Sequence, residues 1–365
     1  MKTLVISDLH LGVQRNGGTT IASAAALREY GHEQHRKLLR LAPAHGCNQV
    51  IVNGDLADVY DIPLLQALQI YEDTHNFLSA NPGSEMVWGV GNHDLSKDSS
   101  RLGSVAFIGA LLGMRHDNFM LLTKAAAISR DTYLIPHVPN QDLFELELSR
   151  IPEGTKFVLL HCNYDNKFAC AADHSLDLSR EQAKALKARG FKMIFGHEHQ
   201  GRESLGGSVV VVGNNFPSSI ADCLPHGDGQ KDGMKRALII DHDAGTTEYV
   251  GTWTPNDTVG GYNVVDWRGL KDAEGDRQGF IRVEGSALAA EAADVIKAIS
   301  AFRQRSAAFV ITNAVKVEQI EGLADISASI EDIRSVNVID LLMEHLDPKQ
   351  RAAVNALYER VEVVA

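Results

Sequence analysis

The sequence predicts an α/β fold, and two observations lead to that prediction. The first is a series of short apolar runs that each end in polar residues, at 3–10, 49–58, 86–94, 156–163 and 192–199. Each run is typical of a buried strand followed by a loop. The second is that helix-like stretches lie between the runs, at 21–41, 63–80 and 178–189. Strands that alternate with helices along a chain are typical of layered α/β proteins.

Later elements extend this pattern. The helix at 178–189 has a polar start and is followed by Gly190, a residue type that commonly ends helices. Two further apolar runs, at 207–215 and 237–250, are predicted strands. The second is expected to form a hairpin that turns around 243–245. We expect both runs to complete a layer that faces the first sheet.

The chain changes character after residue 250. Residues 251–277 are rich in Gly, Asn, Asp, Trp and Pro and lose their periodicity, which indicates a linker. Residues 278–332 contain strand-like runs on either side of a helical stretch, and we expect a small α+β unit there. Two amphipathic patterns, at 338–346 and 349–361, predict a terminal helix pair within residues 336–363.

Composition limits the classes of function. The chain has 365 residues, of which 44% are hydrophobic, so it can bury the core of one large domain and a smaller one. A formal net charge of -12 argues against a protein that binds nucleic acid simply by being basic, although bound cations would attract phosphate locally. The four cysteines form no CxxC pair, so neither a zinc ribbon nor a disulfide framework is predicted. No export signal or membrane span is recognisable, and we expect a soluble cytoplasmic protein.

Carboxylate and histidine side chains follow the first two predicted strands. Asp8 and His10 are two residues apart where the chain leaves regular pleating, so both can turn towards one cation. Taken alone, this pair is as readily a helix N-cap and a surface histidine. Asp55 follows the next strand, and the preceding Gly54 permits a tight turn. A lone Gly-Asp after a strand is usually only a turn.

Three further strands end in amide and imidazole groups. A Gly-Asn-His-Asp motif offers Asn92 as an amide ligand, with His93 beside it to face a substrate. His161 ends another apolar run, and a Gly-His-Glu-His motif places His197 and His199 two residues apart. Neutral imidazole, carboxylate and amide oxygen together suit manganese, iron or zinc better than calcium.

The shared position of these residues at strand ends strengthens their assignment as metal ligands. In open α/β sheets ligands collect beyond the carboxyl ends of the strands, so five such strands point their polar groups at one place. A single histidine is more often a surface or core residue than a metal ligand. Because these histidines belong to a set of five motifs that follow one another at strand ends, we expect them to be ligands. The candidate metal ligands are Asp8, His10, Asp55, Asn92, His161, His197 and His199.

The order of these motifs resembles that of the calcineurin-like metallophosphoesterase superfamily, over roughly residues 1–220. The resemblance implies a two-layered β-sandwich flanked by helices, in a catalytic domain at 1–250. It implies two divalent metal ions, with Mn²⁺ expected and Fe²⁺ or Zn²⁺ as alternatives. His93 would stabilise or protonate the leaving oxygen. The implied ligands of one metal are Asp8, His10, Asp55 and His199, and those of the other are Asp55, Asn92, His161 and His197.

Within the superfamily, the chain resembles SbcD-type double-strand-break-repair nucleases. The opening Ser-Asp-Leu-His-Leu-Gly, the loop GNNFPSS at 213–219 and the long C-terminal extension carry this resemblance. It implies a DNA exonuclease or endonuclease subunit of an SbcCD-type DNA repair and recombination complex. Residues 278–332 would cap the site and help position DNA, and 336–363 would dock on an SMC-like coiled-coil ATPase. Homodimers are common among such nucleases, and no membrane contact is expected. The apolar stripe suited to docking comprises Ile339, Leu342, Leu346, Val354, Leu357 and Val361.

Two other functions are compatible with the same motifs. The main alternative is a free-standing calcineurin-like phosphatase or phosphodiesterase that acts on a protein, a nucleotide or a small phosphoester. Two features depart from the SbcD-type pattern: the segment at His161 reads HCNYD, and no basic, aromatic-rich surface is recognisable in 278–332. A non-catalytic metal-binding scaffold is disfavoured because every expected ligand and His93 are present.

Overall fold

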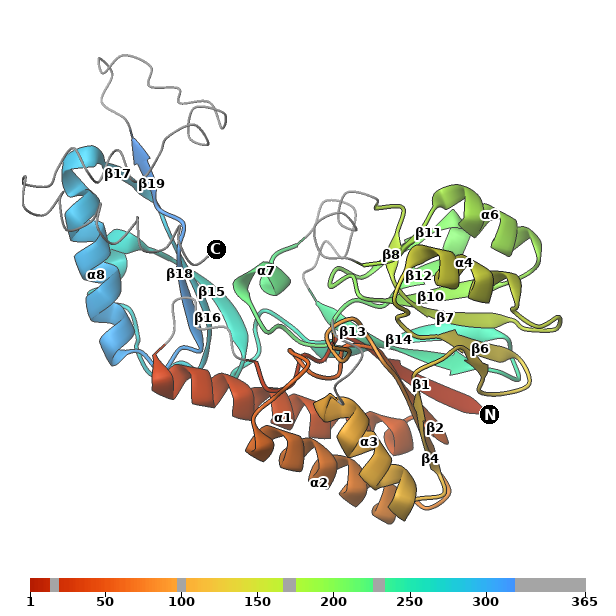
Figure 1. The fold of residues 1–365 in the computed structure, drawn as a ribbon. Helices are drawn as coiled ribbons and strands as arrows, with labels where there is room; N and C mark the ends of the chain where they lie inside the picture. The colour runs from red at the N-terminus through yellow and green to blue at the C-terminus, as the bar shows by residue number, and fades with distance from the viewer. Residues whose placement is uncertain (14–19, 97–102, 167–174, 226–233, 319–365) are drawn as a thin grey trace, which may run out of the picture. The chain divides into compact units, whose positions relative to one another are not determined.

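Two six-stranded sheets lie face to face in the computed structural model, and helices cover their outer sides (Figure 1). The predicted α/β fold, with two strand layers flanked by helices, is therefore confirmed. Among the described residues, no helix combines the length and the hydropathy that crossing a membrane requires. The structure describes residues 1–13, 20–96, 103–166, 175–225 and 234–318.

The first sheet contains the first three predicted strands and has the order β14–β13–β1–β2–β3–β4. Strands β1 to β4 are parallel, whereas β13 is antiparallel to β1 and to β14. Three helices alternate with the parallel strands and pack on one side of the sheet (Figure 1). The strands are β1 (Lys2–Ile6), β2 (Gln49–Asn53), β3 (Glu85–Gly89), β4 (Phe119–Leu122), β13 (Lys235–Asp241) and β14 (Thr246–Trp253). The helices are α1 (Ile21–Ala44), α2 (Leu64–Ala80) and α3 (Ser104–Arg115).

The second sheet has the order β11–β12–β10–β7–β6–β5 and contains the other two predicted strands. Helices α4 (Gln141–Ser149) and α6 (Arg180–Ala188) cover its outer side. Its strands are β5 (Ala126–Ala127), β6 (Thr132–Ile135), β7 (Phe157–His161), β10 (Lys192–Gly196), β11 (Arg202–Ser204) and β12 (Val209–Val211). Two short strands, β8 (Asn163–Tyr164) and β9 (Asp177–Leu178), pair with each other outside this sheet. The short helix α7 spans Ile220–Cys223. The 3-10 helices span Leu205–Gly207, Trp267–Gly269 and Ala289–Glu291.

Apolar side chains between the two sheets hold the sandwich together. Val5 and Ile51 of the first sheet pack in one cluster with Leu159 and Ile194 of the second, and all four are fully buried. Removing such a side chain from water contributes about 1.5–3 kcal/mol to folding. Every residue of β2 is buried, as expected for a strand covered on both faces. This packing fixes the strand ends on which the candidate ligands lie.

A smaller sheet follows the sandwich, with helix α8 (Ala292–Arg305) packed against it. Its three strands are parallel in the order β15–β16–β18. Its aromatic side chains Phe280 and Phe309 share a core with Tyr30 of α1. Residues up to Ala287 and Glu291–Lys316 therefore form one compact unit. The strands are β15 (Gly261–Asp266), β16 (Gly279–Glu284) and β18 (Val310–Asn313), and shorter strands are β17 (Ser286–Leu288) and β19 (Lys316–Glu318).

The structure differs from the sequence-based expectations in two places. The hairpin at 237–250 forms, but it joins the first sheet beside β1 and does not enter the facing layer, because β13 satisfies the free backbone edge of β1. The stretch 251–277 was expected as a linker and contains β15, which pairs along its whole length with β16. The predicted helix pair within 336–363 and its apolar stripe lie outside the described residues.

Candidate metal centre

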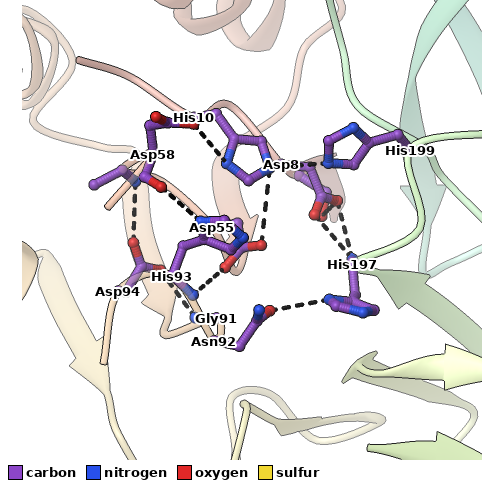
Figure 2. A network of polar contacts seen from close by, with 12 residues as sticks. Asp8, His10, Asp55, Asp58, Gly91, Asn92, His93, Asp94, His197 and His199 are labelled. Carbon is purple, nitrogen blue, oxygen red and sulfur yellow. Dashed lines mark hydrogen bonds and ion pairs between the residues drawn. The ribbon is translucent and has the colours of Figure 1, made fainter. Parts of the chain in front are cut away.

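The predicted site residues meet at one edge of the sandwich, where strands from both sheets end (Figure 2). The first sheet contributes residues just after β1, β2 and β3, and the second contributes residues at the ends of β7 and β10. All seven candidate ligands and His93 are brought together there. They are Asp8, His10, Asp55, Asn92, His93, His161, His197 and His199.

The backbone at four of these residues is strained. The φ angles are 54° at Asp8, 44° at His10, 49° at Asp55 and 79° at His197. This left-handed region is sparsely populated by residues other than glycine, and such strain persists only where the surrounding structure enforces it. The four residues lie just beyond the ends of β1, β2 and β10, where the chain turns sharply.

Glycines leave the space that these side chains fill. A Cβ atom on Gly54 would lie 2.0 Å from Nδ1 of His161, and φ at this glycine is +88°. A Cβ atom on Gly91 would lie 2.1 Å from Oδ1 of Asp55. Both distances are far below van der Waals contact, so the glycine of each motif is required by the close approach of a neighbouring candidate ligand.

The first group of metal-ligating atoms comprises Asp8, His10 and His199, whose ligand atoms lie within 4.8 Å of one another. Nε2 of His10 is 3.0 Å from Nε2 of His199. The Asp8 carboxylate accepts hydrogen bonds of 2.9 and 3.1 Å from the backbone N–H of His197. This carboxylate is therefore oriented by the same loop that supplies the histidines.

The second group comprises Asp55, His161 and His197, again within 4.8 Å. Asn92 lies among them, since its Oδ1 is 3.2 Å from Nε2 of His161 and 2.9 Å from Nδ1 of His197. Oδ1 of Asp55 is 3.4 Å from Nε2 of His161, and Oδ2 is 3.8 Å from Nε2 of His10. Asp55 thus lies between the two groups.

His93 lies beside both groups and forms a third cluster of potential ligand atoms with His10 and Asp55, again within 4.8 Å. Its backbone N–H donates to Oδ1 of Asp55 at 2.9 Å, and its ring is packed edge-on against the ring of His10 at 4.8 Å between centroids. Nδ1 is 2.5 Å from the backbone carbonyl oxygen of Asp58, which can only accept, so Nδ1 carries a proton. Nε2 is then the ring nitrogen that can exchange a proton with a substrate.

Several residues that support the site were not identified from the sequence. The Asp94 carboxylate accepts from the backbone N–H groups of Leu56, Ala57 and Gly91, and so ties the loop after β2 to the loop after β3 (Figure 2). The carbonyl oxygen of Asn53 accepts from Nδ1 of His161 at 2.8 Å. In the sequence, Asp94 and Asn53 look like ordinary loop or strand residues. The one hint was that Asp94 is the last residue of the Gly-Asn-His-Asp motif.

Asp222 is a further supporting residue. Its Oδ1 is 2.8 Å from Nδ1 of His199. It belongs to a Ser-x-x-Asp capping box that starts at Ser219 and opens α7. That pattern is visible in the sequence, but nothing local connects it with His199, which lies 23 residues away.

Burial and mutual charge shift the ionisation of these groups. Burial alone raises the pKa of Asp55, but neighbouring imidazoles, His161 foremost, outweigh it and hold the pKa well below the usual range. Burial lowers the pKa of His161, yet the carboxylates of Asp55 and Asp8 raise it to about 9. Burial, with the charge of Asp55, raises the pKa of Asp94 to about 6. The carboxylates and imidazoles of the site are therefore close enough to shift one another's ionisation strongly.

The donor set fits divalent metal ions. Nδ1 of His199 faces a carboxylate, so the proton lies on Nδ1 and Nε2 presents a lone pair towards His10. Nδ1 of His10 lies 3.8 Å from Oδ1 of Asp58, and the other ring nitrogen, Nε2, faces His199. Two imidazole nitrogens and carboxylate oxygens that converge in this way need a shared cation. Imidazole and carboxylate suit Mn²⁺, Fe²⁺ or Zn²⁺.

The chain was compared with curated proteins and with solved structures. No curated protein matches the chain. Similar solved structures include the protein TT1561 of Thermus thermophilus, with 14% identity, a TM-score of 0.40, and coverage of 69% of this chain and 99% of that one. An archaeal phosphodiesterase shares 13% identity, with a TM-score of 0.34 and coverages of 69% and 99%. A dimetal phosphatase from Danio rerio shares 11%, with a TM-score of 0.37 and coverages of 70% and 97%.

TM-scores this low carry no argument about activity. The family model is decisive, because the one described as calcineurin-like phosphoesterase matches residues 1–201, which is more than half of the chain. The matched range contains all seven candidate ligands and His93. The chain therefore belongs to the calcineurin-like phosphoesterases, hydrolases that use divalent metal ions to cleave phosphoester bonds.

Proposed function

We propose that this phosphoesterase is a Mn²⁺-dependent phosphodiesterase that cleaves DNA, as the nuclease subunit of an SbcCD-type repair and recombination complex. The observation that carries the proposal is the α+β unit built on the catalytic sandwich. Phe280 and Phe309 of this unit pack on Tyr30 of α1, the helix that follows the Asp8–His10 motif. Tyr30 lines the same pocket as His10, and a unit anchored there suits a polymeric substrate more than a small ester.

The proposed ligand sets follow the two groups of atoms. One metal would be held by Asp8, His10 and His199. The other would be held by Asn92, His161 and His197, and Asp55 would bind both. Bound divalent cations supply Lewis acidity, which neutralises charge on phosphoryl oxygens and makes water a stronger nucleophile.

Side chains of the protein position the substrate and transfer a proton. The carboxylates and imidazoles fix the positions at which the scissile phosphate is held. His93 lies on the substrate side, with its Nδ1–H engaged by the Asp58 carbonyl. We assign to its Nε2 the transfer of a proton to the departing oxygen, a step that commonly contributes 10²–10⁴-fold to the rate.

The substrate assignment is tested with the purified full chain. It is incubated with Mn²⁺, Fe²⁺ or Zn²⁺ and with linear double-stranded DNA, single-stranded DNA or a chromogenic phosphodiester. We expect DNA cleavage that is strongest with Mn²⁺. Robust turnover of the small ester without any cleavage of DNA would overturn the nuclease assignment and support a free-standing phosphodiesterase.

The proposed ATPase partner would bind through residues 336–363. A coiled-coil ATPase encoded beside this gene would be the protein to test. The full chain should capture that ATPase from a co-expression lysate, and a chain that ends at residue 335 should not. Equal capture by both chains would rule out this docking segment.

We also propose a homodimer through an apolar face on α2 and α3. The two helices pack side by side (Figure 1), and α3 has no charged residue before Arg115. Apolar side chains exposed on both helices would let the same surface of two copies meet, as a two-fold contact requires. The exposed side chains of this face are Leu64, Leu65, Leu68, Phe107, Leu111 and Met114.

Light scattering tests the dimer. The wild-type chain should have the mass of two copies, and the double variant Leu68→Glu with Leu111→Glu the mass of one. Leu146→Glu, on the exposed side of α4, is the matched control and should leave the dimer intact. A wild-type chain that is monomeric at micromolar concentration would contradict the proposal.

A further inference from the structure

Asp222 makes a buried contact with one of the proposed metal ligands. Its carboxylate is only 3% exposed, and its Oδ1 lies 2.8 Å from Nδ1 of His199. A carboxylate can only accept a hydrogen bond, so the proton of the imidazole is held on Nδ1. In the neutral ring Nε2 of His199 is then unprotonated, and it faces Nε2 of His10 at 3.0 Å.

The orientation of the Asp222 carboxylate is fixed by its second oxygen. Oδ2 accepts from the backbone N–H groups of Ser218 and Ser219, at 3.1 and 2.9 Å. It also accepts from the two serine hydroxyls, at 3.2 and 2.8 Å. Because the backbone donors cannot reverse their role, an oxygen must occupy this position. The other carboxylate oxygen is left to face His199.

The backbone of His199 is anchored as well. Nζ of Lys235, a side chain only 3% exposed, donates to the carbonyl oxygen of His199 at 3.2 Å. Both the ring and the main chain of this histidine are thus tied to residues that come after it in the sequence. By contrast, Nδ1 of His161 donates to a neutral carbonyl, that of Asn53. The described structure gives a carboxylate partner at Nδ1 within hydrogen-bond distance to His199 and not to His161.

We propose that Asp222 is a positioning residue that fixes the Nδ1–H tautomer of His199 and so makes its Nε2 a metal ligand. The carboxylate also raises the basicity of the imidazole, which strengthens its bond to a metal. This inference rests on the proposed role of His199 as a ligand. It adds a residue that lies beyond the matched family range and acts through a ligand, without contacting the substrate itself.

The substitution Asp222→Asn separates this role from a merely structural one. The amide oxygen would take the position that faces Ser218 and Ser219, since both backbone groups there are donors. The amide NH₂ would then face His199 and drive its proton to Nε2, the atom that should bind metal. A purely structural role predicts that Asp222→Asn is milder than Asp222→Ala, because the amide preserves volume and the cap. A positioning role predicts that it is at least as severe.

Two readouts other than activity test the inference. Nitrogen-15 spectra of the metal-free chain, with the His199 signals assigned through His199→Gln, should show the Nδ1–H tautomer in wild type and the Nε2–H tautomer in Asp222→Asn. Titration calorimetry with Mn²⁺ should show an affinity about 10–100-fold lower for one site in both Asp222 variants. Asp142→Asn, an exposed aspartate in the first turn of α4, is the matched control and should bind Mn²⁺ like wild type.

The outcomes test the positioning role of Asp222 separately from the assignment of His199 as a metal ligand. If His199→Ala binds Mn²⁺ like wild type, the assignment of His199 as a ligand is wrong. If His199→Ala loses affinity while Asp222→Asn keeps both the Nδ1–H tautomer and the affinity, the role of Asp222 is wrong. Ser219→Ala removes one hydroxyl donor to Oδ2 of Asp222 and keeps the backbone donor, so it should lower Mn²⁺ affinity less than Asp222→Asn does. A loss of Mn²⁺ affinity in Ser219→Ala as large as in Asp222→Asn would overturn the positioning role.

Discussion

At the scale of single residues, the site is built from groups that are individually unfavourable. Asp8, His10, Asp55 and His197 have left-handed backbone conformations, and the carboxylates among them are almost completely buried. Each strained residue costs on the order of 1–3 kcal/mol. The fold around them offsets this cost, and the result is a preformed set of donors that a metal ion can enter with little reorganisation.

The first prediction separates catalysis from metal binding. His93→Ala should retain its metals and lose about 10²–10⁴-fold in kcat, because His93 belongs to neither proposed ligand set and its ring packs on the ring of His10. Asp55→Asn should lose occupancy at both positions, because Asp55 lies between them. Metal analysis and steady-state kinetics of the two proteins decide this. Equal metal loss in both variants would refute the assigned roles.

The second prediction concerns the glycine before Asn92. Gly91→Ala should destabilise the fold and impair metal binding, because the new Cβ would lie 2.1 Å from Oδ1 of Asp55. Gly113→Ala is the control: a Cβ there meets open space within α3, and alanine should be neutral or more stable by up to about 1 kcal/mol. Urea denaturation of the two variants measures the difference. A Gly91→Ala protein as stable as wild type would show that the site can relax around the methyl group.

At the scale of elements, helix α1 combines a packing role with a buried histidine. The pKa of His35 falls to about 3, chiefly because burial disfavours the cation and also because His32 and Arg36 lie nearby. Neither ring nitrogen has a hydrogen-bond partner among the described residues. The helix therefore packs against the sandwich with this imidazole neutral.

The third prediction is the pH dependence that follows. As the pH falls below 6.5, the unfolded chain takes up a proton at His35 while the folded chain stays neutral until about pH 3. This group should thus lower the free energy of unfolding by up to about 1.4 kcal/mol per pH unit across that window, and contribute nothing further above it. His35→Leu should flatten the dependence in urea melts at pH 5 and pH 7, whereas the exposed control His45→Gln should not. An unchanged slope in His35→Leu would count against the buried neutral imidazole.

At the scale of the whole molecule, the sandwich and the α+β unit share one core. Tyr30 of α1 packs at 5.1 Å from Phe309 and 6.3 Å from Phe280, measured between ring centroids. Phe216, in the loop before α7, also packs edge-on against Tyr30, at 6.0 Å between ring centroids. The loop that leads to Asp222 therefore packs on the same aromatic cluster as the α+β unit.

The fourth prediction is that these parts unfold together. Phe309→Ala should lower the single unfolding temperature in calorimetry and cost about 3–5 kcal/mol, since its side chain is 1% exposed. The control Ile296→Ala, at a side chain 66% exposed on α8, should have little effect. Two separate transitions in the wild-type protein would show that the α+β unit folds independently.

Much of the fold and the site was predictable because the relevant signals are local. Buried strands of an α/β sheet are short apolar runs, and the groups that collect at their carboxyl ends follow them directly in the chain. Asp8, Asp55 and His161 could be identified in this way. The prediction that β-strands at 237–250 form a hairpin was right for the same reason, since the turn is a local feature.

What the sequence by itself determined is therefore the set of strands, their polar ends and the family these motifs define. Only the tertiary structure decided which edge the hairpin joins, that 251–277 contains β15, and that Asp94 and Asp222 hold the ligand loops. These features depend on contacts between residues far apart in the chain, and no local pattern encodes them. His199 and Asp222 show the reason: one hydrogen bond of 2.8 Å fixes a proton, and its partners lie 23 residues apart in the chain.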